Sequence, residues 1–302
     1  MTIVAISGSH GFIGAALVPA LISRGDRVLR LVRGNPGGPD DVMWDPAGER
    51  IDASRLDGVD AVIHLAGENV AGGRWTPGRK TRIRDSRVQG TRLLAESLAR
   101  LAHPPRVFIS ASATGYYGSR GSEILREDSG PGAGFLADVC RAWEAAADPA
   151  RRAGVRVVHT RFGIVLSARG GVLSRVLPVF RAGFGGPLGT GRQYVSWIAI
   201  DDLVAAMLHV LATDAVSGPL NVVAPHPVTN AQFTAALGRA LSRPAMLPVP
   251  AAVLRFVFGE MADDTLLASQ RVEPARLLGS GFAFGFPEID TAFRHLLRRG
   301  RH

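Results

Sequence analysis

Three glycines, each three residues after the last, follow the first apolar segment of this 302-residue chain and limit its fold more than any other feature. Residues 2–7 (TIVAIS) predict a short buried strand, and the segment from residue 11 has the apolar spacing of a helix. Gly8 permits the tight turn out of the strand, Gly11 lets backbone N–H groups approach a pyrophosphate, and Gly14 permits close helix–sheet packing. This context predicts a dinucleotide site; the alternative is a simple tight turn.

Strand and helix patterns alternate along the first half of the chain. The expected strands are 2–7, 27–33, 58–66, 104–110 and 155–162, and the expected helices are 11–25, 76–102 and 135–154. The second half is less regular, with helices expected at 170–183, 201–214 and 228–241, and strands at 194–200 and 219–224. Strand–helix–strand repetition indicates a parallel sheet covered on both faces. We therefore predict an α/β fold: a Rossmann-like doubly wound parallel sheet with a small, mostly helical C-terminal region on the substrate side.

The residues that follow the second and third strands bear on which cofactor binds. Arg33, with Arg30 nearby, stands where NAD sites carry an acidic residue for the ribose 2′-hydroxyl. A guanidinium binds a 2′-phosphate that a carboxylate would repel, so Arg33 favours NADP(H) over NAD(H), unless it is only an exposed charge. Ala66 and Gly67 are small enough for a cofactor ribose or adenine to lie against the strand end, whereas we expect His64 to be structural.

Composition excludes several classes of protein. The 35 basic and 26 acidic residues give a net charge of +9, but the arginines are scattered, so nucleic-acid binding is not expected. The sequence contains no run of about 18 apolar residues, so a membrane-spanning helix is not expected. The single cysteine, Cys140, excludes a disulfide framework and fits a cytoplasmic location. Cysteine and histidine spacing does not match a metal site.

Several motifs together resemble the extended short-chain dehydrogenase/reductase superfamily. They are HLAGEN (64–69), SATGYYG (112–118), FLADVCRAWEAAA (135–147), RFGIVLSARGGVL (161–173) and FGGPLGTGRQYVSWIAIDDL (184–203). More closely, the chain resembles atypical epimerase-family members, which are NAD(P)-dependent epimerase/dehydratase-like and carry a C-terminal domain of unknown function. The resemblance implies an NAD(P)-binding Rossmann-like epimerase domain over 1–225, with substrate-side insertions from about 165, and a small C-terminal helical domain over 245–300.

The same resemblance implies a set of cofactor contacts. By position they are Gly8, Gly11, Phe12, Ile13, Arg33, Leu65, Ala66, Arg87 and Ile164, and Ser110 at the ISAS strand end is a further candidate. With Gly14 and Gly67, these are the residues that we expect to hold NADP(H).

The superfamily's usual catalytic set is a serine followed by Tyr-x-x-x-Lys on a helix, in which the lysine lowers the tyrosine pKa. Ser112 matches the serine, but the tyrosine position falls on Leu136 and the lysine position on Cys140. Lys80 is the only lysine, far upstream, so the standard Tyr–Lys pair is excluded by counting. Ser112, Tyr116 and Tyr117 remain the catalytic candidates, the two tyrosines as a substitute acid or only as a pocket wall.

From the second half, Arg192, Tyr194 and Trp197 are candidate substrate-side residues, although Tyr194 fits equally well as a strand residue that packs under the cap. We predict an NADP(H)-binding oxidoreductase or epimerase-like protein that acts on an unknown small molecule. The alternative is a non-catalytic NADP(H)-binding sensor or scaffold, which the missing Tyr–Lys pair favours. A homodimer is left open.

Overall fold

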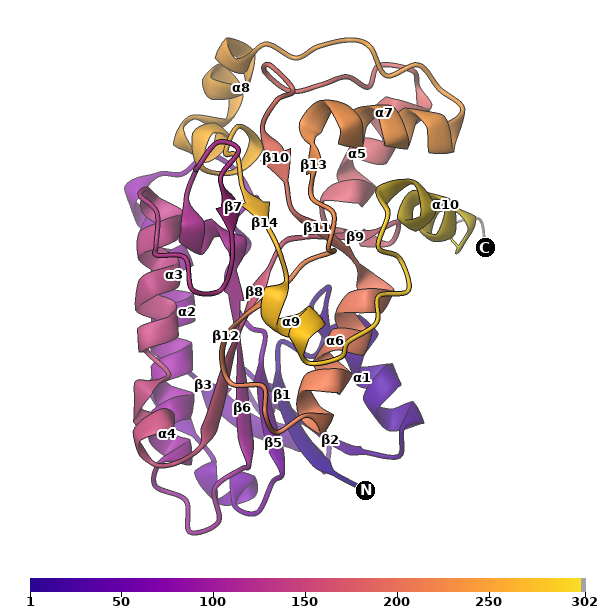
Figure 1. The fold of residues 1–302 in the computed structure, drawn as a ribbon. Helices are drawn as coiled ribbons and strands as arrows, with labels where there is room; N and C mark the ends of the chain where they lie inside the picture. Colours follow the sequence, from indigo (N-terminus) through magenta and orange to yellow (C-terminus); the bar gives the residue numbers. More distant parts are fainter. Residues whose placement is uncertain (300–302) are drawn as a thin grey trace.

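A central sheet of eight strands organises the computed structural model, which describes residues 1–299 (Figure 1). The order across the sheet is β12-β8-β6-β5-β1-β2-β3-β4, and every neighbouring pair is parallel except β3 and β4. The strands are β1 (Ile3–Ser7), β2 (Arg27–Val32), β3 (Asp41–Asp45), β4 (Arg50–Ile51), β5 (Ala61–His64), β6 (Val107–Ala113), β8 (Arg156–Phe162) and β12 (Gly218–Val222). The predicted fold class is confirmed.

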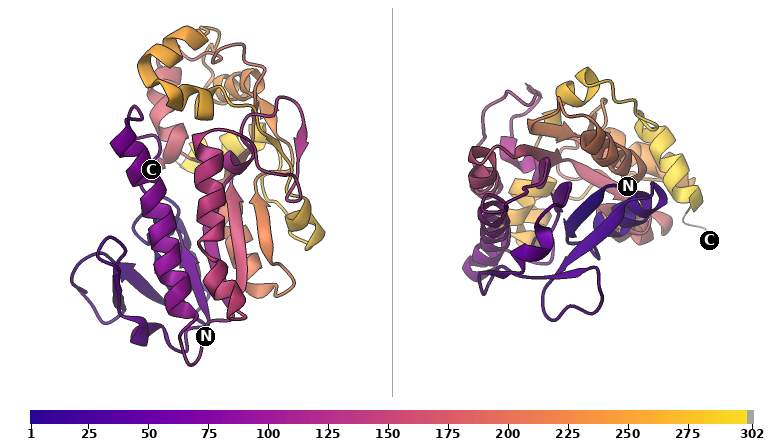
Figure 2. Two further views of the ribbon diagram at one scale, coloured as in Figure 1. Left: turned by 90° about the vertical axis from the view of Figure 1, so that its left-hand side faces the viewer. Right: turned by 90° about the horizontal axis from the view of Figure 1, so that it is seen from below.

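Helices cover both faces of this sheet (Figures 1 and 2). One face carries α1 (Gly14–Ser23) and α6 (Ile200–Ala212), and the other carries α2 (Pro77–Leu98), α3 (Phe135–Ala145) and α4 (Asp148–Arg152). Each face buries its own apolar cluster, one containing side chains from α1 and α6 and the other side chains from α2. The strands are therefore buried on both faces, as expected of a parallel sheet.

The remaining elements lie mainly beyond the carboxyl ends of the strands (Figure 1). They are η1 (Ala53–Leu56), η2 (Thr114–Tyr117), β7 (Ile124–Leu125), β9 (Ile164–Ser167), α5 (Gly171–Arg181), β10 (Tyr194–Val195), β11 (Trp197–Ala199), β13 (Val228–Thr229), α7 (Asn230–Leu241), α8 (Ala251–Phe258), η3 (Ala262–Leu266), β14 (Arg271–Val272), α9 (Ala275–Gly279) and α10 (Ile289–Arg299). We call residues 164–199 and 226–272, which lie above the carboxyl edge, the cap.

The C-terminal residues join the rest of the molecule at several separate places. β14 pairs with β7, α9 packs against β12, and α10 packs against α7. In Figure 1, α8, α9 and α10 accordingly lie well apart. The C-terminal segment therefore contacts both the sheet, through α9, and the cap, through α10.

The structure differs from the sequence expectations at several places. β3 and β4 were not expected. The helix expected over 135–154 divides into α3 and α4, because Pro149 lies in the first turn of a new helix, where its missing N–H is tolerated. The strand expected over 194–200 divides into β10 and β11, which pair with β13 and β9.

Within residues 1–299, we find no helix that combines the length and the apolar character needed to cross a bilayer.

Candidate functional site

The glycine turn between β1 and α1 has room only for backbone. Gly8 has φ +71°, and a Cβ there would lie 2.9 Å from the backbone nitrogen of Ala66. A Cβ on Gly14 would lie 2.2 Å from the carbonyl oxygen of Gly8, and one on Gly11 would lie 3.1 Å from the same atom. Helix α1 has no side-chain cap and no acidic residue in its first turn. This helix end therefore fits an anionic pyrophosphate.

Arg33 lies immediately beyond the end of β2, beside this turn. The register pairs Ser7 with Leu31, which places Arg33 two residues past the level at which β1 ends. Its side chain is exposed, as a contact to a ligand phosphate would require. The position supports the expected role of Arg33 without testing it.

The end of β5 forms the neighbouring wall of the same edge. Leu65 and Ala66 donate their backbone N–H groups to Ser7 Oγ, at 3.2 and 3.3 Å. A Cβ on Gly67 would lie 3.3 Å from the guanidinium carbon of Arg87, which donates to the carbonyl oxygen of Glu68 at 3.0 Å. Four of the expected cofactor residues therefore gather at one strand end.

His64, at the end of β5, is fully buried. Its Nδ1 lies 2.5 Å from Ser7 Oγ, and its ring packs edge-to-face on Trp44 with 5.6 Å between centroids. Burial lowers the pKa of His64 to about 3, so the ring is neutral. These contacts support the structural role that we expected for this histidine.

Four further expected cofactor residues lie in different surroundings. Phe12 packs on the start of α5, because a Cβ on Gly170 would fall 2.6 Å from its ring. Ile13 packs against the core on the α1 face, and Ile164 lines the cavity described next. Ser110 is fully buried inside β6, so its hydroxyl does not reach the surface of this edge, and a direct cofactor contact from that hydroxyl is not supported.

A cavity of about 400 Å³ lies between the end of β6, helix α3 and the cap. The sheet side contributes Ala113, Thr114 and Gly115, and α3 contributes Leu136, Val139, Cys140 and Trp143. The cap contributes Tyr194, Met261, Asp264, Leu266 and Gln270, among others. Its size and its place at the carboxyl edge of a parallel sheet are those of a small-molecule site.

Leu136 and Cys140 occupy the positions of the missing catalytic pair and face the end of β6. A Cβ on Gly115 would lie 3.3 Å from Leu136 Cβ and 3.8 Å from Cys140 Sγ. Burial raises the pKa of the Cys140 thiol to about 11, so this group is neither a base nor a nucleophile near neutral pH.

The single lysine is closer in space than in sequence. Lys80 Nζ lies 4.5 Å from the centroid of the Phe135 ring, at the start of α3, but it binds Glu260 at 2.7 Å and does not line the cavity. It therefore does not replace the missing catalytic lysine.

Three polar residues of the cavity were missed by sequence reasoning: Thr114, Asp264 and Gln270. Asp264 Oδ2 accepts from the backbone N–H of Leu136 at 3.2 Å, and burial raises the Asp264 pKa above its ordinary value. Thr114 Oγ1 donates to Gln270 Oε1 at 2.8 Å. Asp264 and Gln270 come from the cap, so no local pattern around β6 could have indicated them; Thr114 lay within a motif that we had noted.

Ser112 and Tyr117, two of the three expected catalytic residues, belong to a buried polar network. Ser112 Oγ donates to Glu144 at 2.7 Å, and Glu144 holds Arg161 through two contacts of 2.8 Å. Arg161 Nη1 donates to the Tyr117 hydroxyl at 2.8 Å, and that hydroxyl donates to Asn221 at 2.8 Å. We call these five residues the Arg161 network.

The Arg161 network is largely buried, and none of its five residues lines the cavity. Tyr117 is fully buried, and burial raises its pKa to about 12. The ring of Tyr116 lies under the Arg161 guanidinium, with 3.5 Å from Cζ to the centroid. Ser112, Tyr116 and Tyr117 are absent from the cavity lining, which argues against their expected role in proton transfer.

The expected substrate-side residues separate in the same way. Tyr194 lines the cavity, and its ring lies 5.1 Å from the guanidinium carbon of Arg271. Arg192 is exposed outside the lining, and Trp197 is fully buried in the core of the cap itself, where its Nε1 donates to the His226 carbonyl at 3.2 Å. Only Tyr194 of these three therefore reaches the cavity.

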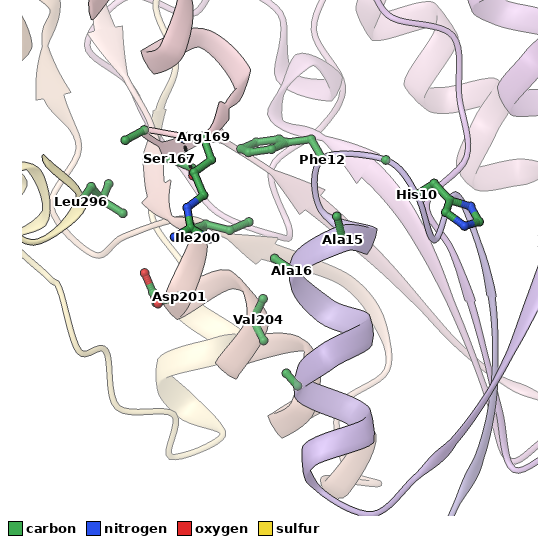
Figure 3. Close-up of a pocket in the computed structure, with 13 residues that line it drawn as sticks. His10, Phe12, Ala15, Ala16, Ser167, Arg169, Ile200, Asp201, Val204 and Leu296 are labelled. Atoms are coloured by element: carbon green, nitrogen blue, oxygen red, sulfur yellow. Dashed lines mark hydrogen bonds between the residues drawn. The ribbon is translucent and has the colours of Figure 1, made fainter. Parts of the chain in front are cut away.

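A larger hollow, of about 710 Å³, lies on the outer side of the glycine turn (Figure 3). Phe12, Ala16, Arg169 and Val204 line it, and none of its lining residues is shared with the cavity.

Among the described residues we find no group of three or more His, Cys, Asp or Glu side chains that could hold a metal.

Two family models match the chain. Residues 4–223 match the NAD dependent epimerase/dehydratase family, and residues 249–296 match a domain of unknown function, DUF1731. An epimerase family protein of Mycobacterium bovis, Mb2239, is 43% identical over 297 residues that cover 98% of each chain.

Solved structures show the same fold. The crystal structure of human epimerase family protein SDR39U1 (isoform2) with NADPH has a TM-score of 0.90 and 35% sequence identity, covering 98% of this chain and 99% of that one. UDP-N-acetylglucosamine 4-epimerase from Bacillus cereus has a TM-score of 0.78 at 17% identity, with both chains fully covered, and this likeness shows the fold alone.

Proposed function

Because the chain belongs to the NAD-dependent epimerase/dehydratase family, we propose that it binds NADP(H) along the carboxyl edge of its sheet and acts on a small molecule in the cavity under the cap. The observation that carries this proposal is the alignment, on one edge, of the bare N-terminus of α1, the exposed Arg33 and the cavity. The NADPH in the human structural neighbour supports the choice of cofactor.

Each part of this edge has a separate role. The N–H groups at the start of α1 would bind the pyrophosphate, and Arg33 would bind the 2′-phosphate. When bound, the cofactor would supply hydride transfer at the nicotinamide. Ile164 and the end of β6 would shield that transfer from water on the cavity side.

Asp264 is the residue that we propose for holding and moving the proton. It lines the cavity, it binds the backbone of Leu136 at the tyrosine position of the superfamily's usual catalytic set, and burial favours its protonated form relative to an exposed aspartate. The nearby Glu260 carboxylate favours the protonated form further, whereas Lys80 opposes it. A carboxyl group of this kind performs general acid–base chemistry without a Tyr–Lys pair.

Cofactor choice is tested by calorimetric titration with NADPH and NADH. We expect tighter binding of NADPH, and we expect Arg33→Asp to weaken NADPH by about tenfold to a hundredfold, as for a lost charge-assisted phosphate contact. Arg152→Asp, which changes an exposed arginine on α4, is the matched control. Equal affinity for both cofactors would refute the role of Arg33.

A second candidate function is an NADP(H) sensor without turnover, which Leu136 and Cys140 at the catalytic positions favour. Spectroscopic screening of NADPH oxidation with carbonyl compounds separates the two. An enzyme requires turnover that Asp264→Asn abolishes while NADPH affinity is kept. A sensor predicts no oxidation of any carbonyl and unequal affinities for NADPH and NADP⁺.

A further inference from the structure

The cavity under the cap is lined mainly by hydrocarbon side chains. Leu136, Val139 and Trp143 of α3 face Val176, Phe233 and Leu266 of the cap. These side chains present apolar surface to the cavity. A polar ligand that covered this surface would leave its own polar groups without hydrogen-bond partners, whereas an apolar ligand would not.

Positive charge is scarce in this lining. Arg87 is the one cation among the described lining residues, and its Nη1 already donates to the carbonyl oxygens of Glu68 and Ile83 at 3.0 Å each. Its guanidinium carbon also lies 5.0 Å from the centroid of the Trp143 ring. Arg175, which is outside the lining, donates to the carbonyl oxygen of the lining residue Ala71 at 2.9 Å.

The carboxyl group of Asp264 works against a phosphate ligand. It lines the cavity, and its ionised form would repel a diphosphate, which free arginine or lysine side chains would stabilise. The cavity therefore lacks the charges that a nucleoside diphosphate would need.

The lining does supply a neutral hydrogen-bond donor. Gln270 Oε1 accepts from Thr114, so the Nε2 group is the end that remains to donate. The Nε1 of Trp143 is buried and is not presented to the cavity, although it has no partner among the described residues. One acceptor oxygen on an otherwise apolar ligand would match the Nε2 donor of Gln270.

From these observations we propose that the cavity binds an uncharged, largely apolar carbonyl compound and not a nucleoside diphosphate sugar. The inference deepens the proposed function and rests on it for the idea that this ligand is the substrate. The binding itself is a property of the cavity and is measured separately.

Saturation-transfer NMR on the full chain, with and without NADP⁺, tests the proposal with three probes. Acetophenone carries the carbonyl group, ethylbenzene is its hydrocarbon analogue, and UDP-glucose carries the diphosphate. We expect saturable binding of acetophenone about five- to tenfold tighter than ethylbenzene, which is the value of one hydrogen bond. UDP-glucose should neither bind in this cavity nor displace acetophenone.

Two variants assign the binding to this cavity. Gln270→Met should remove the preference for acetophenone over ethylbenzene, and Leu136→Phe should weaken both by about tenfold by filling the space. Leu278→Phe, which changes a half-exposed leucine on α9 outside the lining, should leave both affinities unchanged. Thermal melting confirms that each variant is folded.

Calorimetry with NADPH on the same samples separates the two proposals. Failure to bind NADPH refutes the proposed function, while the acetophenone result still decides the nature of the cavity. Saturable UDP-glucose binding that displaces acetophenone overturns this inference alone. Absence of acetophenone binding, or binding that Leu136→Phe does not change, also overturns it.

Discussion

Two regions of opposite character meet within a few residues at the end of β6. On one side, the Arg161 network joins Ser112, Glu144, Tyr117 and Asn221 in a closed chain of contacts at 2.7–2.8 Å. On the other side, the cavity is lined mainly by apolar side chains, with Asp264 and Gln270 among its polar residues. The residues that look catalytic in the sequence are in the closed region.

This difference shows how polar residues divide between stability and function. A buried polar group whose partners are all present stabilises the native packing, because exposing or breaking it leaves an unpaired charge or donor. A polar group that lines an apolar cavity is available to a ligand. The Arg161 network is of the first kind, whereas Asp264 and Gln270 are of the second.

The largest expected effect comes from breaking the Arg161 network. Glu144→Ala should lower the free energy of unfolding by about 3–5 kcal/mol, because it leaves the Arg161 charge buried without its carboxylate. Urea denaturation measures the loss. Asp290→Ala, which breaks the exposed Arg239–Asp290 pair, is the control and should cost about 1 kcal/mol or less. Equal losses would show that the network is not buried as described.

Tyr117→Phe tests whether the buried tyrosine is structural. It removes the hydroxyl that accepts from Arg161 and donates to Asn221, so we expect a loss of about 1–3 kcal/mol with unchanged NADPH affinity. Tyr116→Phe, in which the aromatic ring that faces the guanidinium is kept, should cost about 0.5 kcal/mol or less. A loss of NADPH turnover without a loss of stability would contradict the structural role and would indicate that Tyr117 is catalytic.

His64 is a second buried polar site, and its effect on stability can be measured as a function of pH. Its folded pKa of about 3 lies below the ordinary value of 6.5, so its contribution is present above pH 6.5 and is lost as pH falls toward 3. Between pH 7 and pH 5 the free energy of unfolding should fall by about 2 kcal/mol from this residue.

The control for this pH effect is His64→Asn, which keeps an acceptor for Ser7 Oγ. Burial lowers the His159 pKa as well and contributes in the same direction in both proteins. Denaturation curves at several pH values should therefore differ in slope between wild type and variant. Parallel slopes would contradict a neutral buried His64.

The smallest effect is expected on the cavity side. Leu136→Phe should change the free energy of unfolding by less than about 1 kcal/mol, because the added atoms enter empty space. The matched change Leu98→Phe, at a fully buried residue of the α2 core, should cost about 1–3 kcal/mol through overpacking. If both cost the same, the cavity is not open at Leu136.

The parts of the site that could be predicted are those governed by neighbours in sequence. The glycine turn depends on backbone geometry within seven residues, from Gly8 to Gly14, and the structure shows the tight approaches that each glycine permits. Capping of α7 by Thr229 and Gln232 is equally local, because a threonine followed three residues later by a glutamine is a capping-box pattern, and both hydrogen bonds of the box are present.

The parts that could not be predicted depend on distant partners. Tyr117 binds Asn221, 104 residues away, and Asp264 binds the Leu136 backbone across 128 residues. Ser110 and Trp197 stand beside site residues in the sequence, yet both side chains are buried in the core. Lys80 is the opposite case: it is far from α3 in the sequence, yet its side chain lies beside the start of that helix.

By itself the sequence determined the dinucleotide turn and the absence of a Tyr–Lys pair. The first is a property of one short segment, and the second follows from a single lysine and from the residues at two positions. Only the tertiary structure decided which polar groups are paired in the interior and which line the cavity. Burial and hydrogen bonding depend on what β6, α3 and the cap bring together, and these interactions determine both pKa and accessibility.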